Sequence, residues 1–412
     1  MEEIMIHICY ALTDIQGTYS KFLGTSLWSI FMHHMEKDLH IHLLHDETLT
    51  EQERRRFQQV VVSFQQKISF YNMKRLATSD LVFLYQALPQ VGLSRYTYGA
   101  FYRLFAAKFL PEEVTRFIYL DADTVVNMDI AFLWKVSLDG HTMAAVSDSD
   151  NTGHQAENPL VLVGWVDGRD YFSSGVLLVD RQKFLAVGNI LQDGVCKLKE
   201  IPGFAFYDQD ILNLFYSKDY LHLDIAYNAY VPILQMRGVQ QLTSAIYHYE
   251  AGSLGIREDD VYDRLFYTVF AQTPWCDADF LYRFFAQLEA QHKHDLHLAR
   301  QVFAMGSRRQ RIFCANEASK AAIKELFDFD GDDKYLAIQG NQDWTGRLLQ
   351  YERVSPKGNR LYILFLQRYE DVSQALTAAG WQEGLDFVDG WSLLPTECGG
   401  HLFLRPELIR NL

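Results

Sequence analysis

Residues 116–127, RFIYLDADTVVN, decide the fold, because a short apolar stretch ends there abruptly in acidic residues. Arg116 to Leu120 is rich in aromatic and β-branched residues, which predicts a strand. The carboxylates of Asp121 and Asp123 follow the end of this strand, where burial without a partner would be costly. Residues i and i+2 of an extended segment point to the same side, so we expect both carboxylates to face one cation.

The chemistry of this pair favours a hard divalent ion. Carboxylate oxygens select Mg²⁺ or Mn²⁺ over Zn²⁺. An ion held there would neutralise a diphosphate and act as a Lewis acid on a departing phosphate group. The alternative is a capped turn, because Asp-x-Asp also occurs by chance in soluble proteins. The pair by itself leaves both interpretations open.

An apolar segment precedes the strand. Residues 98–109, YGAFYRLFAAKF, are apolar on all sides, which predicts a buried helix that Pro111 closes. Arg103 is the charged residue in its middle. Because a buried charge requires a partner, we expect Arg103 to contact an acidic group.

The N-terminal region alternates between strand and helix patterns. The predicted elements are a strand at residues 4–12, a helix at Phe22–Met35, a strand at His40–Leu44, a helix that begins at the Thr50-x-x-Glu53 box, and a strand at Lys67–Tyr71. Further along, strands are predicted at Met143–Val146 and Gly175–Val179, and a helix at Asp208–Phe215. This alternation predicts an α/β fold with a mainly parallel sheet flanked by helices, in which ligands bind at the carboxyl ends of the strands.

A second, smaller domain is predicted at the C-terminal end. Residues 277–303 have a helical pattern, and Gly306 and Ser307 precede a basic stretch that we interpret as a linker. Strand and helix patterns alternate again beyond it, so we predict one domain over residues 1–305, including a helical segment from about 260, and a small Rossmann-like accessory α/β domain over residues 306–412.

Composition excludes several classes of protein. Of the 412 residues, 49% are hydrophobic and 22% charged, which are globular proportions. The net charge of −14 disfavours nucleic acid as a partner. The five cysteines form no CxxC pair and suggest free thiols in a reducing compartment. With no basic N-terminal leader and no apolar run of about 18 residues, we expect a cytoplasmic protein without an integral membrane segment.

Four motifs in order resemble bacterial family 8 retaining glycosyltransferases, which have a GT-A fold. They are residues 96–127, YFSSGVLLVD at 171–180, DQDILN at 208–213 and IYHY at 246–249. The resemblance covers roughly residues 4 to 280. It implies a UDP-hexose donor carrying galactose or glucose, a divalent cofactor, and a glycan, glycoprotein or lipid-linked acceptor, and it leaves the oligomeric state open.

The resemblance also implies roles for individual residues. Asp121, Asp123 and His248 match the family's metal ligands, and the imidazole favours Mn²⁺, with Mg²⁺ as the alternative. Arg103, Asp208 and Gln209 match residues near the donor sugar, and Gln209 would stabilise developing positive charge. The positions that match the nucleotide and donor contacts are Ala11, Asp14, Tyr19, Ala122, Ser173, Ser174 and Gly252.

Two departures from the family's pattern leave a second hypothesis open. Ser173 replaces the usual asparagine, and the segment after Tyr249 lacks the lysine that clamps the diphosphate in the family, for which Arg257 is a candidate substitute. The leading hypothesis is a retaining hexosyltransferase. The alternative is a non-catalytic partner subunit that stabilises a sister transferase.

Histidines concentrate in residues 33–45. His40 and His42 alternate along a predicted strand, while His33 and His34 adjoin a helix end. This arrangement resembles a metal cluster, but we interpret these residues as scattered surface histidines.

Overall fold

The structure is a computed structural model of the chain. It describes residues 5–15, 17–89, 91, 97–201, 207–250, 254–255, 257, 259–286, 310–317, 320–327, 329, 331–338, 346, 348–349, 360–366, 369–390 and 393. The contacts divide the chain into two compact units, Met1–Asp277 and Ala278–Leu412. The domain boundary predicted near residue 306 lies outside the described residues, so the division into 1–305 and 306–412 stays a prediction.

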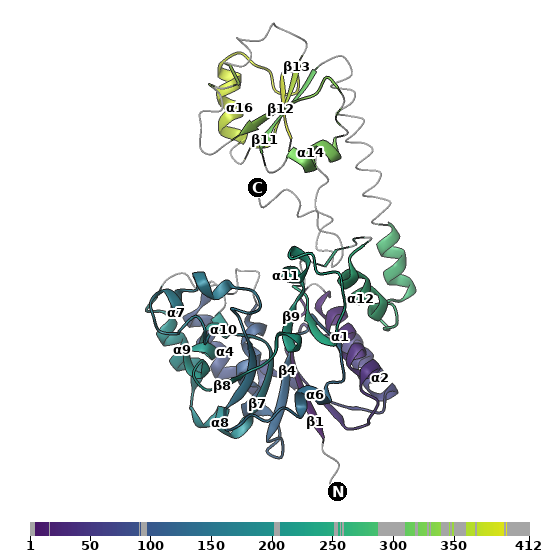
Figure 1. Cartoon of the computed structure of the whole chain (residues 1–412), viewed down its shortest axis with the longest axis vertical. Coiled ribbons are helices and arrows are strands. Elements are labelled where there is room, and N and C mark those ends of the chain that lie inside the picture. The colour runs from purple at the N-terminus through teal and green to yellow at the C-terminus, as the bar shows by residue number, and fades with distance from the viewer. Residues whose placement is uncertain are drawn as a thin grey trace. The chain divides into compact units, whose positions relative to one another are not determined.

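A seven-stranded sheet forms the centre of the first unit (Figure 1). In spatial order its strands are β3 (Lys67–Asn72), β2 (Leu39–His45), β1 (Ile6–Leu12), β4 (Arg116–Leu120), β7 (Phe172–Asp180), β6 (Met143–Ser147) and β8 (Tyr220–His222). Within this sheet, neighbouring strands are parallel except where β7 pairs with β4 and β6. The predicted mixed, mainly parallel sheet is therefore confirmed.

Helices cover both faces of this sheet; in Figure 1, α1 and α2 lie on one side of β1 and β4, and α4, α9 and α10 on the other. The α-helices of the unit are α1 (Tyr19–His33), α2 (Glu51–Ser63), α3 (Met73–Leu76), α4 (Thr78–Ala87), α5 (Ala106–Phe109), α6 (Ala131–Trp134), α7 (Pro159–Leu162), α8 (Arg181–Ala186), α9 (Ile190–Leu198), α10 (Tyr207–Tyr216), α11 (Val231–Met236) and α12 (Val261–Phe270). The backbone N–H of Glu53 donates to Thr50 Oγ1 at 3.2 Å, so α2 begins at the predicted capping box. Among the described residues, no helix combines the length and the apolar character needed to cross a bilayer.

The segment predicted as one buried helix over residues 98–109 differs from the prediction. It is a 3₁₀ helix, η2 (Tyr98–Phe105), followed by the short α5. A 3₁₀ helix has three residues per turn, so residues three apart align, and Tyr102 and Phe105 are both buried. Gly99 is needed here because a Cβ atom at this position would lie 2.2 Å from Thr13 Oγ1.

A second, three-stranded sheet begins immediately after the acidic pair. Its order is β5 (Thr124–Asn127), β10 (Ala245–His248) and β9 (Ala229–Tyr230). β10 is antiparallel to β5 and pairs His248 with Thr124. This pairing brings the IYHY motif beside the end of β4, although the two segments are far apart in the sequence.

The second unit contains a four-stranded parallel sheet in the order β12 (Lys334–Ile338), β11 (Gln310–Asn316), β13 (Arg360–Leu364) and β14 (Phe387–Asp389). The helices α14 (Lys320–Leu326) and α16 (Tyr369–Ala378) accompany it. The predicted alternation of strands and helices in this region is therefore observed. Of the helix predicted at 277–303, residues 278–286 are helical and the remainder lies outside the described residues.

Replacing Trp275 with alanine is expected to destabilise the first unit by about 3–5 kcal/mol, the usual cost of removing a large aromatic core residue. The indole is 1% exposed, packs against Phe57 at 4.9 Å between ring centroids, and donates a hydrogen bond to Glu53. It also fills the space beside Gly24, where a Cβ atom would lie 2.3 Å from the ring. Urea unfolding of the full chain measures the loss.

The matched control is Trp165→Ala, because this indole is 39% exposed. We expect a change within about 0.5 kcal/mol for it, as for most surface substitutions. Equal losses for the two variants would contradict a core role for Trp275.

Candidate functional site

Asp121, Ala122 and Asp123 form the link through which the chain passes from the large sheet to the small one. The N–H of Asp121 donates to the carbonyl of Gly175 at 2.8 Å, which extends the pairing of β4 with β7. The hydroxyl of Thr124 donates to the carbonyl of Asp121 at 2.9 Å. The N–H of Tyr249 donates to the carbonyl of Asp123 at 2.8 Å. Backbone bonds to two separate strands therefore fix this link.

His248 lies close to both carboxylates. Its Nε2 is 3.4 Å from Asp123 Oδ1 and 3.8 Å from Asp121 Oδ2. One ligand atom from each of the three residues lies within 4.8 Å of the others. The structure thus brings the three predicted metal ligands together.

A residue that sequence reasoning missed orients the imidazole. Asn228, at the end of the 3₁₀ helix η4 (Ile225–Asn228), is fully buried, and its Oδ1 lies 3.0 Å from His248 Nδ1. The Nδ2 of Asn228 donates to Ser173 Oγ at 3.0 Å, which leaves the amide oxygen to accept from Nδ1–H. The free lone pair of His248 is then on Nε2, which faces the carboxylates, as a metal-binding histidine requires.

Electrostatics favour a cation among these groups. Burial lowers the pKa of His248, but the hydrogen bond and charge of Asp123 and the charge of Asp121 more than offset this, so that its pKa is raised. Burial raises the pKa of Asp121 despite the opposing charges of Arg103 and His248. The carboxylates therefore favour a positive charge at this place, which a divalent ion would supply, and the donor set of oxygens and one nitrogen fits such an ion.

Arg103 has the acidic partners that its buried position requires. Its Nη2 donates to Asp121 Oδ1 at 2.7 Å, and its Nε lies 3.0 Å from Asp208 Oδ2. Its Nη1 donates to the carbonyl and the hydroxyl of Ser174 at 2.9 and 2.7 Å. Burial opposes the charge on Arg103, but the neighbouring Asp121, Tyr119 and Asp208 raise its pKa overall. Arg103 thus links the metal carboxylates to α10.

Gln209 belongs to the same network. Its Oε1 accepts from the N–H and the hydroxyl of Ser174 at 2.9 and 3.2 Å. Its Nε2 donates to the hydroxyl of Tyr171 at 3.2 Å, and Tyr171 donates to the buried Asp210 at 2.7 Å. The amide is therefore held in one orientation by β7 on one side and by a buried tyrosine on the other.

The residues predicted to contact the nucleotide include positions near the end of β1, at the start of α1 and directly after β4. Asp14 is 6% exposed, and its carboxylate accepts from the backbone N–H groups of Thr18, Tyr19 and Ser20 at 2.7 to 2.9 Å. These bonds hold the start of α1 against Asp14. Tyr19 itself is 41% exposed. Ala11 is near the end of β1, and Ala122 is buried. Donor binding by these residues stays a prediction, and Gly252 lies outside the described residues.

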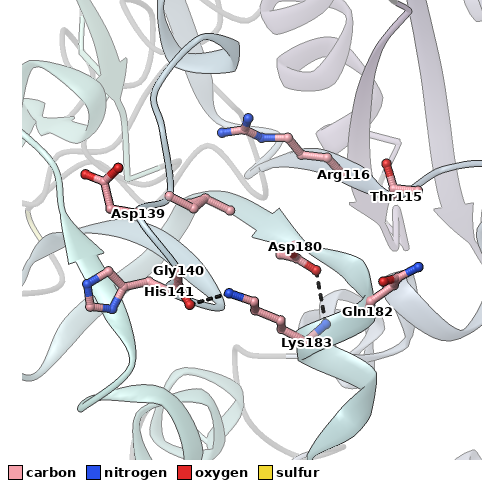
Figure 2. Close-up of a pocket in the computed structure, with 9 residues that line it drawn as sticks. Thr115, Arg116, Asp139, Gly140, His141, Asp180, Gln182 and Lys183 are labelled. Carbon is pink, nitrogen blue, oxygen red and sulfur yellow. Dashed lines mark hydrogen bonds between the residues drawn. The ribbon is translucent and has the colours of Figure 1, made fainter.

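A pocket of about 360 Å³ lies away from the candidate metal site (Figure 2). Its lining includes Arg116, His141, Asp180 and Lys183. Arg116 begins β4, whereas Asp121 follows the end of that strand. The pocket is therefore at the opposite end of β4 from the candidate metal site.

The interpretation of residues 33–45 as scattered surface histidines is wrong for His34, His42 and His45, which are buried, whereas His33 and His40 are half-buried. His34 is 3% exposed and bonds Asp129 and Asp38 through its two ring nitrogens, at 2.7 Å each. His42 is fully buried, and His45 is 7% exposed. Neighbouring strands and loops bury these side chains, and the sequence pattern alone does not reveal that burial.

Alanine at position 175 is expected to weaken divalent metal binding by at least about tenfold, the lower range for disturbing the support of a metal ligand. A Cβ atom at Gly175 would lie 2.3 Å from His248 Cε1 and 3.0 Å from Asp121 Oδ2, so the imidazole has to move. Isothermal titration with Mn²⁺ measures the change. Gly331→Ala is the control because nothing lies within 4 Å of its Cβ position. Unchanged affinity in Gly175→Ala would contradict the arrangement of ligands given above.

The structure thus combines an α/β fold with a cluster of two carboxylates and one histidine at the end of a central strand, an arrangement that could hold a metal ion. The "Glycosyl transferase family 8" profile matches residues 8–253, which is more than half of the chain. The chain therefore belongs to glycosyltransferase family 8. The expected family and fold are confirmed.

Individual relatives agree with this assignment. The chain is 25% identical over 238 residues to general stress protein A of Bacillus subtilis, covering 57% of this chain and 76% of that protein. It is 26% identical over 218 residues to the lipopolysaccharide 1,2-glucosyltransferase of Escherichia coli, covering 52% of this chain and 60% of that enzyme. The solved galactosyltransferase LgtC, in complex with donor and acceptor sugar analogs, matches with a TM-score of 0.53 and 18% identity over 67% of this chain and 99% of that chain. The last similarity concerns the fold alone.

Proposed function

We propose that this protein is a retaining hexosyltransferase that moves galactose or glucose from a UDP-sugar to a glycan, glycoprotein or lipid-linked acceptor. The observation that carries the proposal is the meeting of Asp121, Asp123 and His248, whose ligand atoms lie within 4.8 Å of one another, in a family 8 chain. The names of curated relatives support a hexose, since one is a lipopolysaccharide 1,2-glucosyltransferase and another a lipopolysaccharide 1,3-galactosyltransferase.

The proposed cofactor is Mn²⁺, with Mg²⁺ as the alternative. Asp121, Asp123 and His248 would hold the ion, since Mn²⁺ accepts both oxygen and imidazole ligands. When bound, it would neutralise the charge that develops on the departing diphosphate. Asn228 keeps the imidazole in the tautomer that this coordination needs.

The residues of the chain would then position and stabilise the sugar. Gln209 has a fixed amide that we assign to stabilising positive charge at the anomeric carbon, since an amide is a poor nucleophile. Arg103 holds Asp208 and Asp121 in place through its ion pairs with both carboxylates. Retention requires no separate base, because an oxygen of the leaving phosphate takes the proton of the acceptor on the same face.

Arg257 does not present a free guanidinium for the role of the missing lysine. Its Nε and Nη2 donate to the two oxygens of Asp263 at 2.7 and 2.8 Å. Asp263 is 2% exposed, so this ion pair ties Arg257 to α12. We propose that the diphosphate charge is balanced mainly at the metal, without a lysine clamp.

The proposal also concerns the role of the second unit and the location of the protein in the cell. We assign the C-terminal sheet to acceptor docking or assembly, and we place the protein in the cytoplasm. The free thiols of Cys9, Cys196, Cys276 and Cys314 are compatible with a reducing compartment.

The test incubates the full chain with a panel of UDP-, GDP- and CDP-sugars and Mn²⁺, and measures release of the nucleoside diphosphate. We expect release of UDP from UDP-galactose or UDP-glucose and loss of that release in EDTA. Activity with GDP-sugars alone would overturn the uridine assignment. No turnover with any donor, together with a stable complex with a sister transferase, would favour the non-catalytic alternative.

A further inference from the structure

A second cluster of metal-ligating side chains lies on strands β1 and β2. These strands are parallel neighbours, and their register pairs His7 with His40 and Cys9 with His42. Alternate residues of a strand share a face, so the imidazoles of His7, His40 and His42 all lie on one face of the sheet. The sequence pattern showed only the two histidines of β2, because His7 arrives through strand pairing.

The three rings are close enough to share one ion. One ring nitrogen from each residue lies within 4.8 Å of the others. His7 Nδ1 is 3.0 Å from His42 Nε2, and the rings of His40 and His42 stack with centroids 4.1 Å apart. Tetrahedral Zn²⁺ with Zn–N bonds of about 2.0–2.1 Å holds its nitrogens about 3.4 Å apart, so the rings need only a small adjustment.

Strand β3 supplies partners that orient two of these rings. The hydroxyl of Tyr71 lies 2.9 Å from His42 Nδ1, and that of Ser69 lies 2.9 Å from His40 Nε2. A hydroxyl that accepts from His42 Nδ1–H leaves the Nε2 lone pair directed at His7. Such outer partners fix the tautomer of metal-binding histidines.

The imidazoles are held in their neutral form, which is the form that binds metal. Burial lowers the pKa of His42 to about 2, with smaller contributions from His40 and His7. Burial, followed by the charge of His40, lowers the pKa of His7 to about 4. Burial and then Lys67 lower the pKa of His40, whereas Glu113 opposes this change. His42 is fully buried, while His7 and His40 are only partly buried and leave the cluster accessible.

We propose that His7, His40 and His42 form a second metal site, which takes Zn²⁺ with a solvent molecule as the fourth ligand and clamps β1 to β2. Three imidazoles without a carboxylate form a softer donor set than the one at Asp121, and they suit zinc better than Mg²⁺ or Mn²⁺. The two sites are separate. The pairing of Ile8 with Ile118 places Asp121 about four residues farther along β4 than the level of His7, or roughly 13 Å at 3.3 Å per residue.

The test equilibrates the metal-free full chain with one equivalent of Zn²⁺ in excess Mg²⁺, which competes at the carboxylate site, and measures bound zinc by elemental analysis. We expect one zinc per chain, a rise in melting temperature with zinc, and the visible spectrum of tetrahedral Co²⁺ when cobalt replaces it. The double variant His7→Gln/His40→Gln is expected to bind zinc at least about 100-fold more weakly.

Further variants distinguish zinc bound at the histidine cluster from zinc bound at the carboxylate site. His141→Gln/His222→Gln, at histidines outside the cluster, should retain the zinc. His248→Gln should also retain it, and loss of zinc in this variant but not in His7→Gln/His40→Gln would assign the zinc to the carboxylate site and overturn the proposal. Retained UDP-sugar turnover in His7→Gln/His40→Gln shows that the variant is folded, and His40→Gln alone serves if the double variant does not fold. Absence of zinc binding in the unaltered chain would likewise overturn the second site without affecting the proposed transferase activity.

Discussion

Asparagine at both positions 121 and 123 is expected to reduce release of UDP from a UDP-hexose by at least about 10³-fold. The substitution keeps the shape of the side chains but removes the two negative charges that would hold the ion beside His248. Loss of a metal's stabilisation of a developing diphosphate costs several kcal/mol, and each 1.36 kcal/mol corresponds to about tenfold in rate. The measurement is steady-state UDP release across a range of Mn²⁺ concentrations, paired with titration of Mn²⁺ binding.

The control for this prediction is Asp139→Asn/Asp167→Asn, which removes two exposed carboxylates away from the site. Asp139 has a positive φ of 48°, a conformation that asparagine tolerates. We expect the activity of this control to be unchanged. Undiminished UDP release in the Asp121 and Asp123 variant would refute the assignment of the metal site.

Methionine in place of Arg103 is expected to destabilise the first unit by about 3–5 kcal/mol, the usual cost of breaking a buried ion pair. Arg103 has a side chain only 10% exposed, and it is bonded to both Asp121 and Asp208. Without it, the two partly buried carboxylates of Asp121 and Asp208 have no nearby guanidinium to compensate their charge. Urea unfolding at neutral pH measures this loss, and turnover is expected to fall with it.

Two variants calibrate the Arg103 result. Arg103→Lys keeps the charge but lacks the planar fork that reaches both carboxylates and Ser174, so we expect an intermediate loss. Arg169→Met removes a cation that is 87% exposed and paired with Asp167, and we expect a much smaller loss than for Arg103→Met because solvent screens this pair. If Arg103→Met were as mild as Arg169→Met, the buried network would not have the role described here.

The order of the strands and helices near the N-terminus could be predicted because it depends on local patterns. The strand at Arg116–Leu120 and the helix that begins after Thr50 agree with their predicted limits. The segment at residues 98–109 was predicted with the wrong helix type, because apolar periodicity does not distinguish a 3₁₀ helix from an α-helix when all sides are buried. The antiparallel direction of β7 also follows from tertiary packing and has no local signature.

For the site, the sequence by itself determined that two carboxylates follow a buried strand, that one arginine lies in an apolar segment, and that four motifs occur in the order of a known family. These features are local in the chain or depend on residue identity. Only the tertiary structure decided that Asn228 orients His248, that Ser174 joins Arg103 to Gln209, and that His7 meets the histidines of β2. The physical reason is that strand pairing and the packing of side chains across strands set the distance between residues far apart in the chain, and no local pattern encodes those distances.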